Sequence, residues 1–191
     1  MKSIGITGTI ASGKSLIAQF IHFMGYPIFN ADNEGRKVLE SNNTLEKLQQ
    51  HFGSQIFTNN HLDRKKLAKL VFSNKNELNY LNSIIHPEVV ENYKKWSTSQ
   101  NSEIIFHESA IIFESQLEYL FDATICVFSP IELCTQRALK RDNLSKEEVI
   151  IRMNNQLSPE EKCKKANYII INDEKNAVIP QILSILEKIK S

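Results

Sequence analysis

One segment near the N-terminus constrains the fold more than any other: residues 8–15, with the sequence GTIASGKS. It fits the pattern G-x-x-x-x-G-K-[ST], a loop whose backbone N–H groups surround phosphate groups. An apolar run at residues 4–7 precedes it and predicts a short buried strand. Apolar residues at helical spacing follow at 16–21 and predict a helix. The segment therefore predicts a strand, a tight turn and a helix N-terminus, an arrangement that favours anions.

Individual side chains of this loop have expected tasks. Lys14 is expected to reach the β- and γ-phosphates of a nucleoside triphosphate, and the Ser15 hydroxyl to hold Mg²⁺. The alternative is a glycine-rich turn that matches by chance, and the strand and helix on either side disfavour it. The residues of this segment expected to bind the nucleotide are Gly8, Ala11, Ser12, Gly13, Lys14, Ser15 and Leu16.

Composition excludes several other classes of protein. The 191 residues suffice for one domain with a real core. Lys and Arg total 23 against 22 Asp and Glu, so charge gives no reason to expect a nucleic-acid or acidic membrane partner. No apolar run approaches the roughly 20 residues of a membrane span. Three cysteines without C-x-x-C spacing predict reduced thiols, which are typical of a cytoplasmic enzyme. We expect the protein to be a monomer or a weak homo-oligomer.

Strand and helix patterns alternate along the chain, which predicts an α/β fold with a mostly parallel sheet. A C-terminal amphipathic helix is expected over residues 177–190. Five strands are expected, at residues 2–7, 104–108, 123–128 and 168–172 and, after a turn, within residues 25–30.

Residues 33–97 lack a convincing long strand and carry helical patterns instead. One helix is expected around residues 45–49 and another around 65–71, capped by Asp63. A third is expected over 77–85, with its end at His86-Pro87. We interpret this block as a helical insertion over the sheet, without a core of its own.

Residues 131–165 have the character of a lid. Pro130 favours a helix start, and Asp142-Asn143 predicts the end of that helix. The capping-box spacing of Ser145 and Glu148 predicts a second helix to about residue 156, with Pro159 beyond its end. Two basic helices with a polar connection are typical of a mobile cover over phosphates. The whole chain is thus expected to be one domain, with its core at 1–32, 98–130 and 166–191.

Two carboxylates follow expected strands, where ligands bind in open α/β sheets. Asp32 is the leading candidate to orient or deprotonate a phosphoryl acceptor; the alternative is a helix-capping or turn residue. Glu108 could hold Mg²⁺ through water or bind substrate hydroxyls, and a rim salt bridge is an equal alternative.

Cations are expected on the lid. Arg137 and Arg141 share a helix face, and Arg152 lies on the following helix. Arginines over a polyphosphate would form bidentate contacts and offset charge, whereas the alternative is a solvated polar face. His86 lies in the block expected to receive the second substrate, although a lone histidine is more often structural.

Segments over most of the chain resemble the dephospho-coenzyme A kinase family. Besides the phosphate loop, Arg36 follows the Asn30-Ala31-Asp32 segment as in the family's D-A-D-x-x-x-R. The matching segments are residues 81–87 (LNSIIHP), 108–114 (ESAIIFE), the lid arginines with Gln156, and 166–172 (ANYIIIN). The chain departs from the family pattern at Thr9, Ala11, Leu16, Asn30, Glu108, Ala110 and Asn167.

The resemblance implies ATP-dependent phosphorylation of the ribose 3′-hydroxyl of dephospho-coenzyme A, on a fold with a five-stranded parallel sheet. It implies Asp32, Lys14 and Arg141 as catalytic residues. Arg137, Arg141 and Asn172 would join the loop in binding ATP. Residues expected to contact the acceptor are Asp32, Arg36, His86, Glu108 and Arg152. Two rivals are a different small-molecule or nucleoside monophosphate kinase of the same fold, and a nucleotide-dependent switch.

Overall fold

The computed structural model of the chain describes residues 1–142 and 145–190. They form two compact units, Met1–Asn30 with Gln100–Ser191, and Ala31–Ser99. Among the described residues, no helix has both the length and the apolar character needed to cross a membrane.

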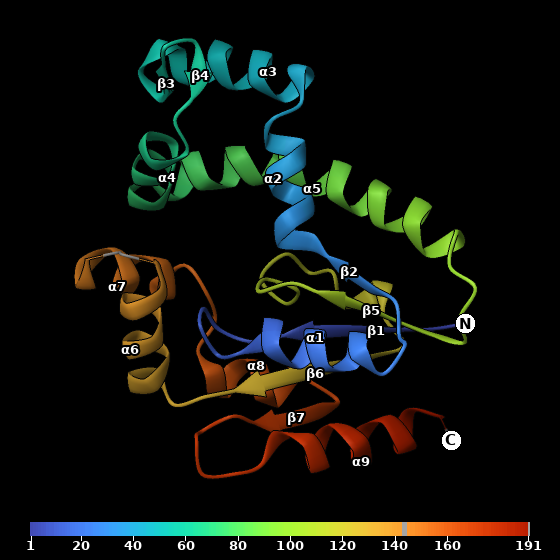
Figure 1. The fold of residues 1–191 in the computed structure, drawn as a ribbon. Helices are drawn as coiled ribbons and strands as arrows, with labels where there is room; N and C mark the ends of the chain where they lie inside the picture. The colour runs from blue at the N-terminus through green and yellow to red at the C-terminus, as the bar shows by residue number, and fades with distance from the viewer. Residues whose placement is uncertain (143–144, 191) are drawn as a thin grey trace. The chain divides into compact units, whose positions relative to one another are not determined.

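The first unit is built on a five-stranded parallel sheet with strand order β2-β5-β1-β6-β7 (Figure 1). The predicted fold class is therefore confirmed, and every predicted strand forms. The strands are β1 (Lys2–Thr7), β2 (Ile28–Asn30), β5 (Ile104–Glu108), β6 (Ala123–Phe128) and β7 (Tyr168–Ile171).

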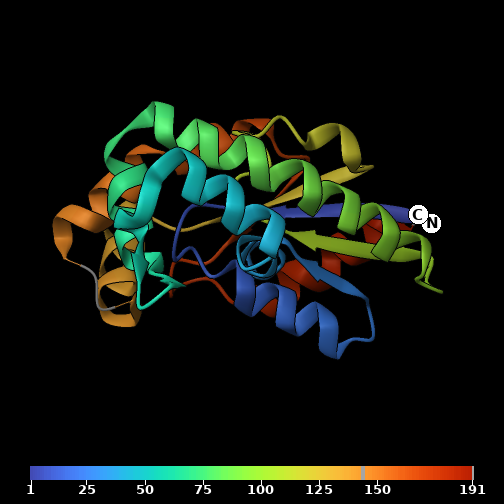
Figure 2. The same ribbon diagram turned by 90° about the horizontal axis from the view of Figure 1, so that it is seen from above.

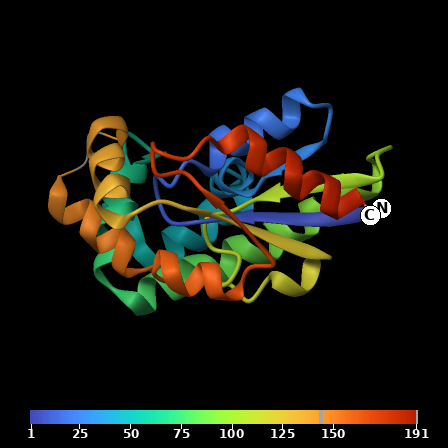
Figure 3. The same ribbon diagram turned by 90° about the horizontal axis from the view of Figure 1, so that it is seen from below.

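Helices cover both faces of this sheet. The helices α1 (Lys14–Phe23) and α9 (Val178–Lys190) lie on one face, where Ile17 and Ile182 join the core formed by alternate strand residues such as Ile4 and Phe106. Cys126 belongs to the opposite face, where its sulfur lies 3.4 Å from that of Cys163 in α8 (Pro159–Lys165). Figure 3 shows α1 and α9 on one side of the strands and α8 on the other. Burial on both faces explains the near-continuous apolar character of the strands.

The parallel strands bring their carboxyl ends to one edge of the sheet. Asn30 at the end of β2 is in register with Glu108 at the end of β5, and Glu108 is in register with Ile6 on β1. The loop after β1 begins one residue beyond Thr7. This register places Asn30 and Glu108, polar residues of two adjacent strands, beside the strand that leads into the phosphate loop, as expected for an open α/β sheet.

Three helices lie in the described part of the lid region, residues 131–142 and 145–165. The helix α6 (Ile131–Asp142) forms as predicted, and α7 (Lys146–Asn154) begins with the predicted capping box of Ser145 and Glu148. The predicted break at Asn143 lies outside the described residues. Pro159 lies beyond the end of α7 as predicted, and it also opens α8, a helix that was not predicted. Ser158 and Glu161 form a second capping box there, a sequence signal of the same kind as the first.

The second unit is helical. Its helices are α2 (Ala31–Leu39), α3 (Asn42–Phe52), α4 (Arg64–Ser73) and α5 (Lys75–Thr98), with the 3₁₀ turn η1 (Gly53–Ile56) and the two short strands β3 (Phe57–Thr58) and β4 (His61–Leu62). In Figure 2, α3 and α4 lie beside the long green helix α5. Their shared core includes Leu48, Phe52, Ile56, Leu67 and Val71. The expectation that this block has no core of its own is therefore wrong.

A second correction concerns α5, which runs through His86-Pro87 to Thr98 instead of ending there. Proline removes one backbone hydrogen bond within a helix. Apolar packing on both sides of Pro87 outweighs that loss: Ile84 joins the core of the unit, and Val89 and Tyr93 are buried. The predicted cap of α4 is confirmed, since the Asp63 carboxylate accepts from two backbone N–H groups.

Candidate active site

The phosphate loop depends on two glycines. Gly13 precedes α1 with φ +100°, and a Cβ there would lie 2.1 Å from Asn172 Nδ2. A Cβ at Gly8 would lie 2.5 Å from the carbonyl oxygen of Val127. Both conformation and space therefore require glycine at these positions. Ala11, by contrast, adopts a left-handed conformation (φ 59°) and packs in a cluster with Ala138 and Val149 of the lid helices.

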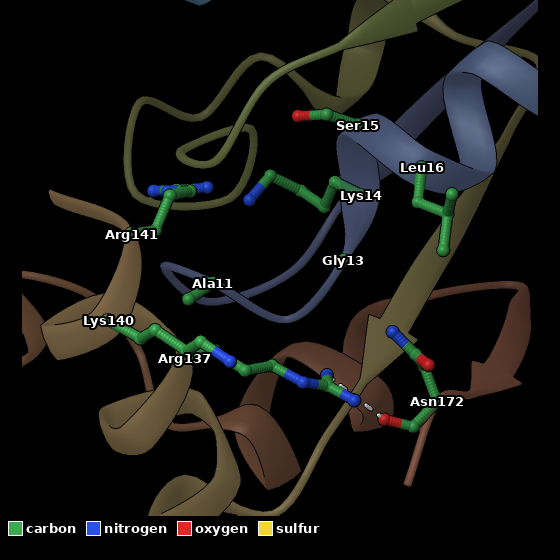
Figure 4. A pocket seen from close by; sticks show the side chains of 9 residues that line it. All are labelled: Ala11, Gly13, Lys14, Ser15, Leu16, Arg137, Lys140, Arg141 and Asn172. Carbon is green, nitrogen blue, oxygen red and sulfur yellow. Dashed lines mark hydrogen bonds between the residues drawn. The ribbon is translucent and has the colours of Figure 1, made fainter. Parts of the chain in front are cut away.

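The two chemically active side chains of the loop differ in exposure. Lys14 is buried, and its Nζ donates to the carbonyl oxygen of Thr9 at 3.2 Å. Ser15 is exposed, and its hydroxyl donates to Glu108 Oε1 at 2.7 Å. Figure 4 shows the Lys14 amine and the Arg141 guanidinium pointing toward one another across the loop. An ammonium and a guanidinium that face the same space suit a polyphosphate.

A pocket of about 550 Å³ opens beside this loop. Lys140 lines it although the sequence interpretation did not include that residue; its spacing from Arg137 on one helix was the available signal. The other lining residues are all predicted ones: Ala11, Gly13, Lys14, Ser15, Leu16, Arg137, Arg141 and Asn172. The structure therefore brings together eight of the ten predicted nucleotide-binding residues, from the loop, the lid and the position after β7, whereas Gly8 and Ser12 are not part of this lining among the described residues. Arg152 lies on α7, and among the described residues it is not part of this lining.

The lid arginine nearest the sheet is held in place by several acceptors. Arg137 Nη1 donates to Ser129 Oγ at 3.1 Å, and Nη2 lies 3.1 Å from a Glu174 carboxylate oxygen. Ser129 in turn donates to the carbonyl oxygen of Asn172. Neither Ser129 nor Glu174 was singled out in the sequence, because neither stands in a motif. Their contacts fix the guanidinium plane along one wall of the pocket.

The Asn172 side chain ties the end of β7 to the phosphate loop. Its Nδ2 donates to the Ser12 carbonyl oxygen at 2.8 Å. A second fastening comes from the lid, since Gln156 Oε1 accepts from the Ile10 N–H at 2.9 Å. The loop is thus held from β7 and from the end of α7.

Glu108 lies at the end of β5 and is 3% exposed. Its Oε1 accepts from Ser15 and its Oε2 accepts from Asn30 Nδ2 at 2.5 Å. Of the alternatives that the sequence left open, this geometry relates Glu108 to the loop serine. The alternative, a salt bridge at the exposed rim of the sheet, does not fit Glu108, because this residue is buried.

Three of the five predicted acceptor-side residues, Asp32, Arg36 and His86, lie in the second unit, whereas Glu108 and Arg152 belong to the first. Asp32 and Arg36 are exposed on α2, four residues apart and therefore on one face. Asp32 lies in the first turn of α2, where its negative charge interacts favourably with the helix dipole. His86 is half-buried in α5, and burial lowers its pKa. The roles of these three residues stay predictions.

Comparison with known proteins decides the family. Residues 2–177 match the sequence profile described as dephospho-CoA kinase. The chain belongs to the dephospho-CoA kinase family. Membership confirms the family predicted from the sequence, and makes this chain a P-loop kinase of coenzyme A biosynthesis.

Individual relatives agree with this assignment. A dephospho-CoA kinase of Bacteroides fragilis is 38% identical over 185 residues, covering 96% of this chain and 90% of the relative. A solved protein from Thermus thermophilus superposes with a TM-score of 0.84 at 32% identity, over 99% of this chain and 96% of the other. A solved dephospho-CoA kinase from Campylobacter jejuni gives 0.68 at 27% identity, over 98% and 96%.

Proposed function

We propose that this chain transfers the γ-phosphoryl group of ATP to the ribose 3′-hydroxyl of dephospho-CoA, giving CoA and ADP. The observation that carries the proposal is the pocket in which Lys14, Ser15, Arg137 and Arg141 meet, in a chain of this kinase family. Phosphoryl transfer needs little covalent chemistry from the protein and depends on positioning and charge. The pocket supplies both.

The loop end of the site fits a metal-bound triphosphate. Lys14 and the backbone N–H groups of the loop hold the β- and γ-phosphates. The buried Ser12 hydroxyl has no hydrogen-bond partner among the described residues, which suits a loop that closes around phosphate oxygens. The Ser15 oxygen keeps lone pairs for Mg²⁺ while its proton is donated to Glu108. Bound there, Mg²⁺ would neutralise charge that develops on the phosphates.

Lid arginines act on the transferred group. Arg141 faces the same space as the Lys14 amine (Figure 4) and offsets charge on the transferring phosphoryl. Arg137, fixed by Ser129 and Glu174, holds the nucleotide against the wall of the pocket. Arg152 joins the acceptor side when the lid covers the site and excludes water, the competing acceptor.

On the acceptor side, Asp32 orients the 3′-hydroxyl and accepts its proton, while Arg36 and His86 contact the rest of the acceptor. We expect Asp32→Ala to lower kcat by about 10²- to 10⁴-fold, the usual contribution of a positioned base, with little change in ATP affinity. Steady-state kinetics with a separate measurement of nucleotide binding test this. An Asp32→Ala enzyme that turns over near the parent rate removes Asp32 from this role.

Acceptor choice separates the proposal from the two rivals. We expect ADP release with Mg-ATP to rise steeply when dephospho-CoA is added and to stay low with AMP, CMP or no acceptor. Ready phosphorylation of AMP or CMP, with dephospho-CoA unchanged, would instead indicate a nucleoside monophosphate kinase. Slow hydrolysis that no acceptor accelerates would indicate a switch. The predicted cytoplasmic location, the oligomeric state and the exclusion of nucleic-acid partners stay predictions.

A further inference from the structure

We infer that Asn30 is a positioning residue for the Mg²⁺ site, acting through Glu108 on the Ser15 hydroxyl. The inference rests on the proposed function, which places Mg²⁺ at Ser15. It assigns a task to a residue at which the chain departs from the pattern of its family.

The three side chains form a continuous chain of hydrogen bonds. Asn30 Nδ2 donates to Glu108 Oε2 at 2.5 Å, and Ser15 Oγ donates to Glu108 Oε1 at 2.7 Å. Asn30 and Glu108 are register partners on adjacent strands, so the backbone of the sheet fixes their separation. Glu108 is 3% exposed. Each of its two oxygens therefore has a fixed partner, and the carboxylate cannot turn without breaking one bond.

The direction of these bonds determines what Ser15 presents to a cation. A hydroxyl has one proton and two lone pairs, and an ionised carboxylate can only accept. Because the Ser15 hydroxyl donates its hydrogen bond to Glu108, the lone pairs of the hydroxyl oxygen stay available to the metal. A hydroxyl that was free to rotate could turn its proton toward the cation instead. Partners that orient a metal ligand in this way typically contribute 10- to 100-fold in metal affinity.

An amide at position 30 suits this arrangement better than a carboxylate. Asp in place of Asn30 would set one acceptor against another at the 2.5 Å contact with Glu108, and the two oxygens would repel unless a proton lay between them. Asn30 supplies a donor and no charge. Glu108 thereby keeps its orientation toward Ser15.

Calorimetric titration of ADP, once with excess Mg²⁺ and once with EDTA, tests the inference without turnover. In Asn30→Ala we expect the gain in ADP affinity that Mg²⁺ provides to fall about 10-fold, the lower end of the effect of orienting partners. Affinity in EDTA should stay within about twofold of the parent, by the same argument. Asn101→Ala, an exposed asparagine outside the helices and strands, should match the parent in both titrations. Asn30→Val, which suits a strand and has no donor, repeats the test if the alanine variant does not fold.

A double-mutant cycle with Glu108→Gln tests whether the effect of Asn30 on Mg²⁺ binding depends on Glu108. Since Asn30 reaches the metal site through Glu108, Asn30→Ala/Glu108→Gln should lose no more of the Mg²⁺ gain than Glu108→Gln alone. Additive losses, or an equal loss of affinity in EDTA, overturn the inference because Asn30 would then act elsewhere. A full Mg²⁺ gain in Asn30→Ala also overturns it. If the parent itself shows no Mg²⁺ gain, the metal site of the proposed function fails first.

Discussion

At the residue scale, the space around single backbone positions limits which side chains the phosphate loop can hold. Gly13 and Gly25 both have left-handed backbone conformations, with φ +100° and +92°. A Cβ at Gly13 would lie 2.1 Å from Asn172 Nδ2, whereas a Cβ at Gly25 would meet nothing within 4 Å. A side chain at Gly25 would therefore introduce backbone strain alone, whereas a side chain at Gly13 would introduce both strain and a steric clash.

We expect Gly25→Ala to lower the free energy of unfolding by about 1 kcal/mol, the cost of a left-handed alanine. Gly13→Ala should cost more and should also weaken ATP binding, because the methyl group displaces the amide that holds Ser12. Chemical denaturation and nucleotide titration of both variants measure the two effects. Equal loss of stability in the two variants, with ATP binding intact, contradicts this account of the loop.

At the scale of elements, an ion pair between buried Lys162 and half-buried Glu114 fastens α8 to the segment after β5. Lys162 is fully buried, and its Nζ lies 2.8 Å from a Glu114 carboxylate oxygen and donates to the carbonyl oxygen of Ala110. The same Glu114 oxygen accepts from the Leu157 N–H, just before α8. The pair therefore holds the base of the lid region against the sheet.

Removal of Lys162 leaves the half-buried charge of Glu114 uncompensated. We expect Lys162→Met to lower the free energy of unfolding by about 3 kcal/mol, at the low end for a broken buried pair. Lys162→Met/Glu114→Gln should recover part of that loss, because the second change removes the unpaired charge. Urea denaturation of the single and double variants measures both values. A double variant that is less stable than Lys162→Met would show that the two residues do not act as a pair.

Local signals predicted many of these elements, and packing decided the rest. The capping box at Ser145 and the cap at Asp63 were predictable because a helix start depends on a few adjacent residues. Pro87 was misleading, since neighbours distant in sequence keep α5 intact around it. Ser129 and Glu174 could not be found from sequence, because only the fold brings them to Arg137.

At the scale of the whole molecule, a buried histidine links stability to pH. His107 on β5 is 1% exposed and stacks on Phe29, and burial lowers its pKa to about 3. Between that value and the ordinary pKa of about 6.5, the unfolded chain binds a proton that the folded chain excludes. The stability contribution is therefore complete above pH 6.5 and is lost as pH falls toward 3.

We expect the free energy of unfolding to fall by about 1.4 kcal/mol per pH unit from this residue alone between pH 6 and 4. In His107→Phe, which keeps an aromatic ring against Phe29, the dependence on pH should be shallower by that amount. Denaturation series at several pH values test this. If the free energy of unfolding has the same dependence on pH in the parent and in the variant, the acid sensitivity arises from other groups.

The central claim is that the phosphoryl group arrives on the ribose 3′-hydroxyl of dephospho-CoA, and phosphorus NMR of the product tests it most directly. With Mg-ATP and dephospho-CoA, we expect a new phosphomonoester resonance on the ribose, formed in equal amount with ADP. A lengthened phosphate chain on the acceptor would contradict the claim, and so would inorganic phosphate released without a phosphorylated acceptor.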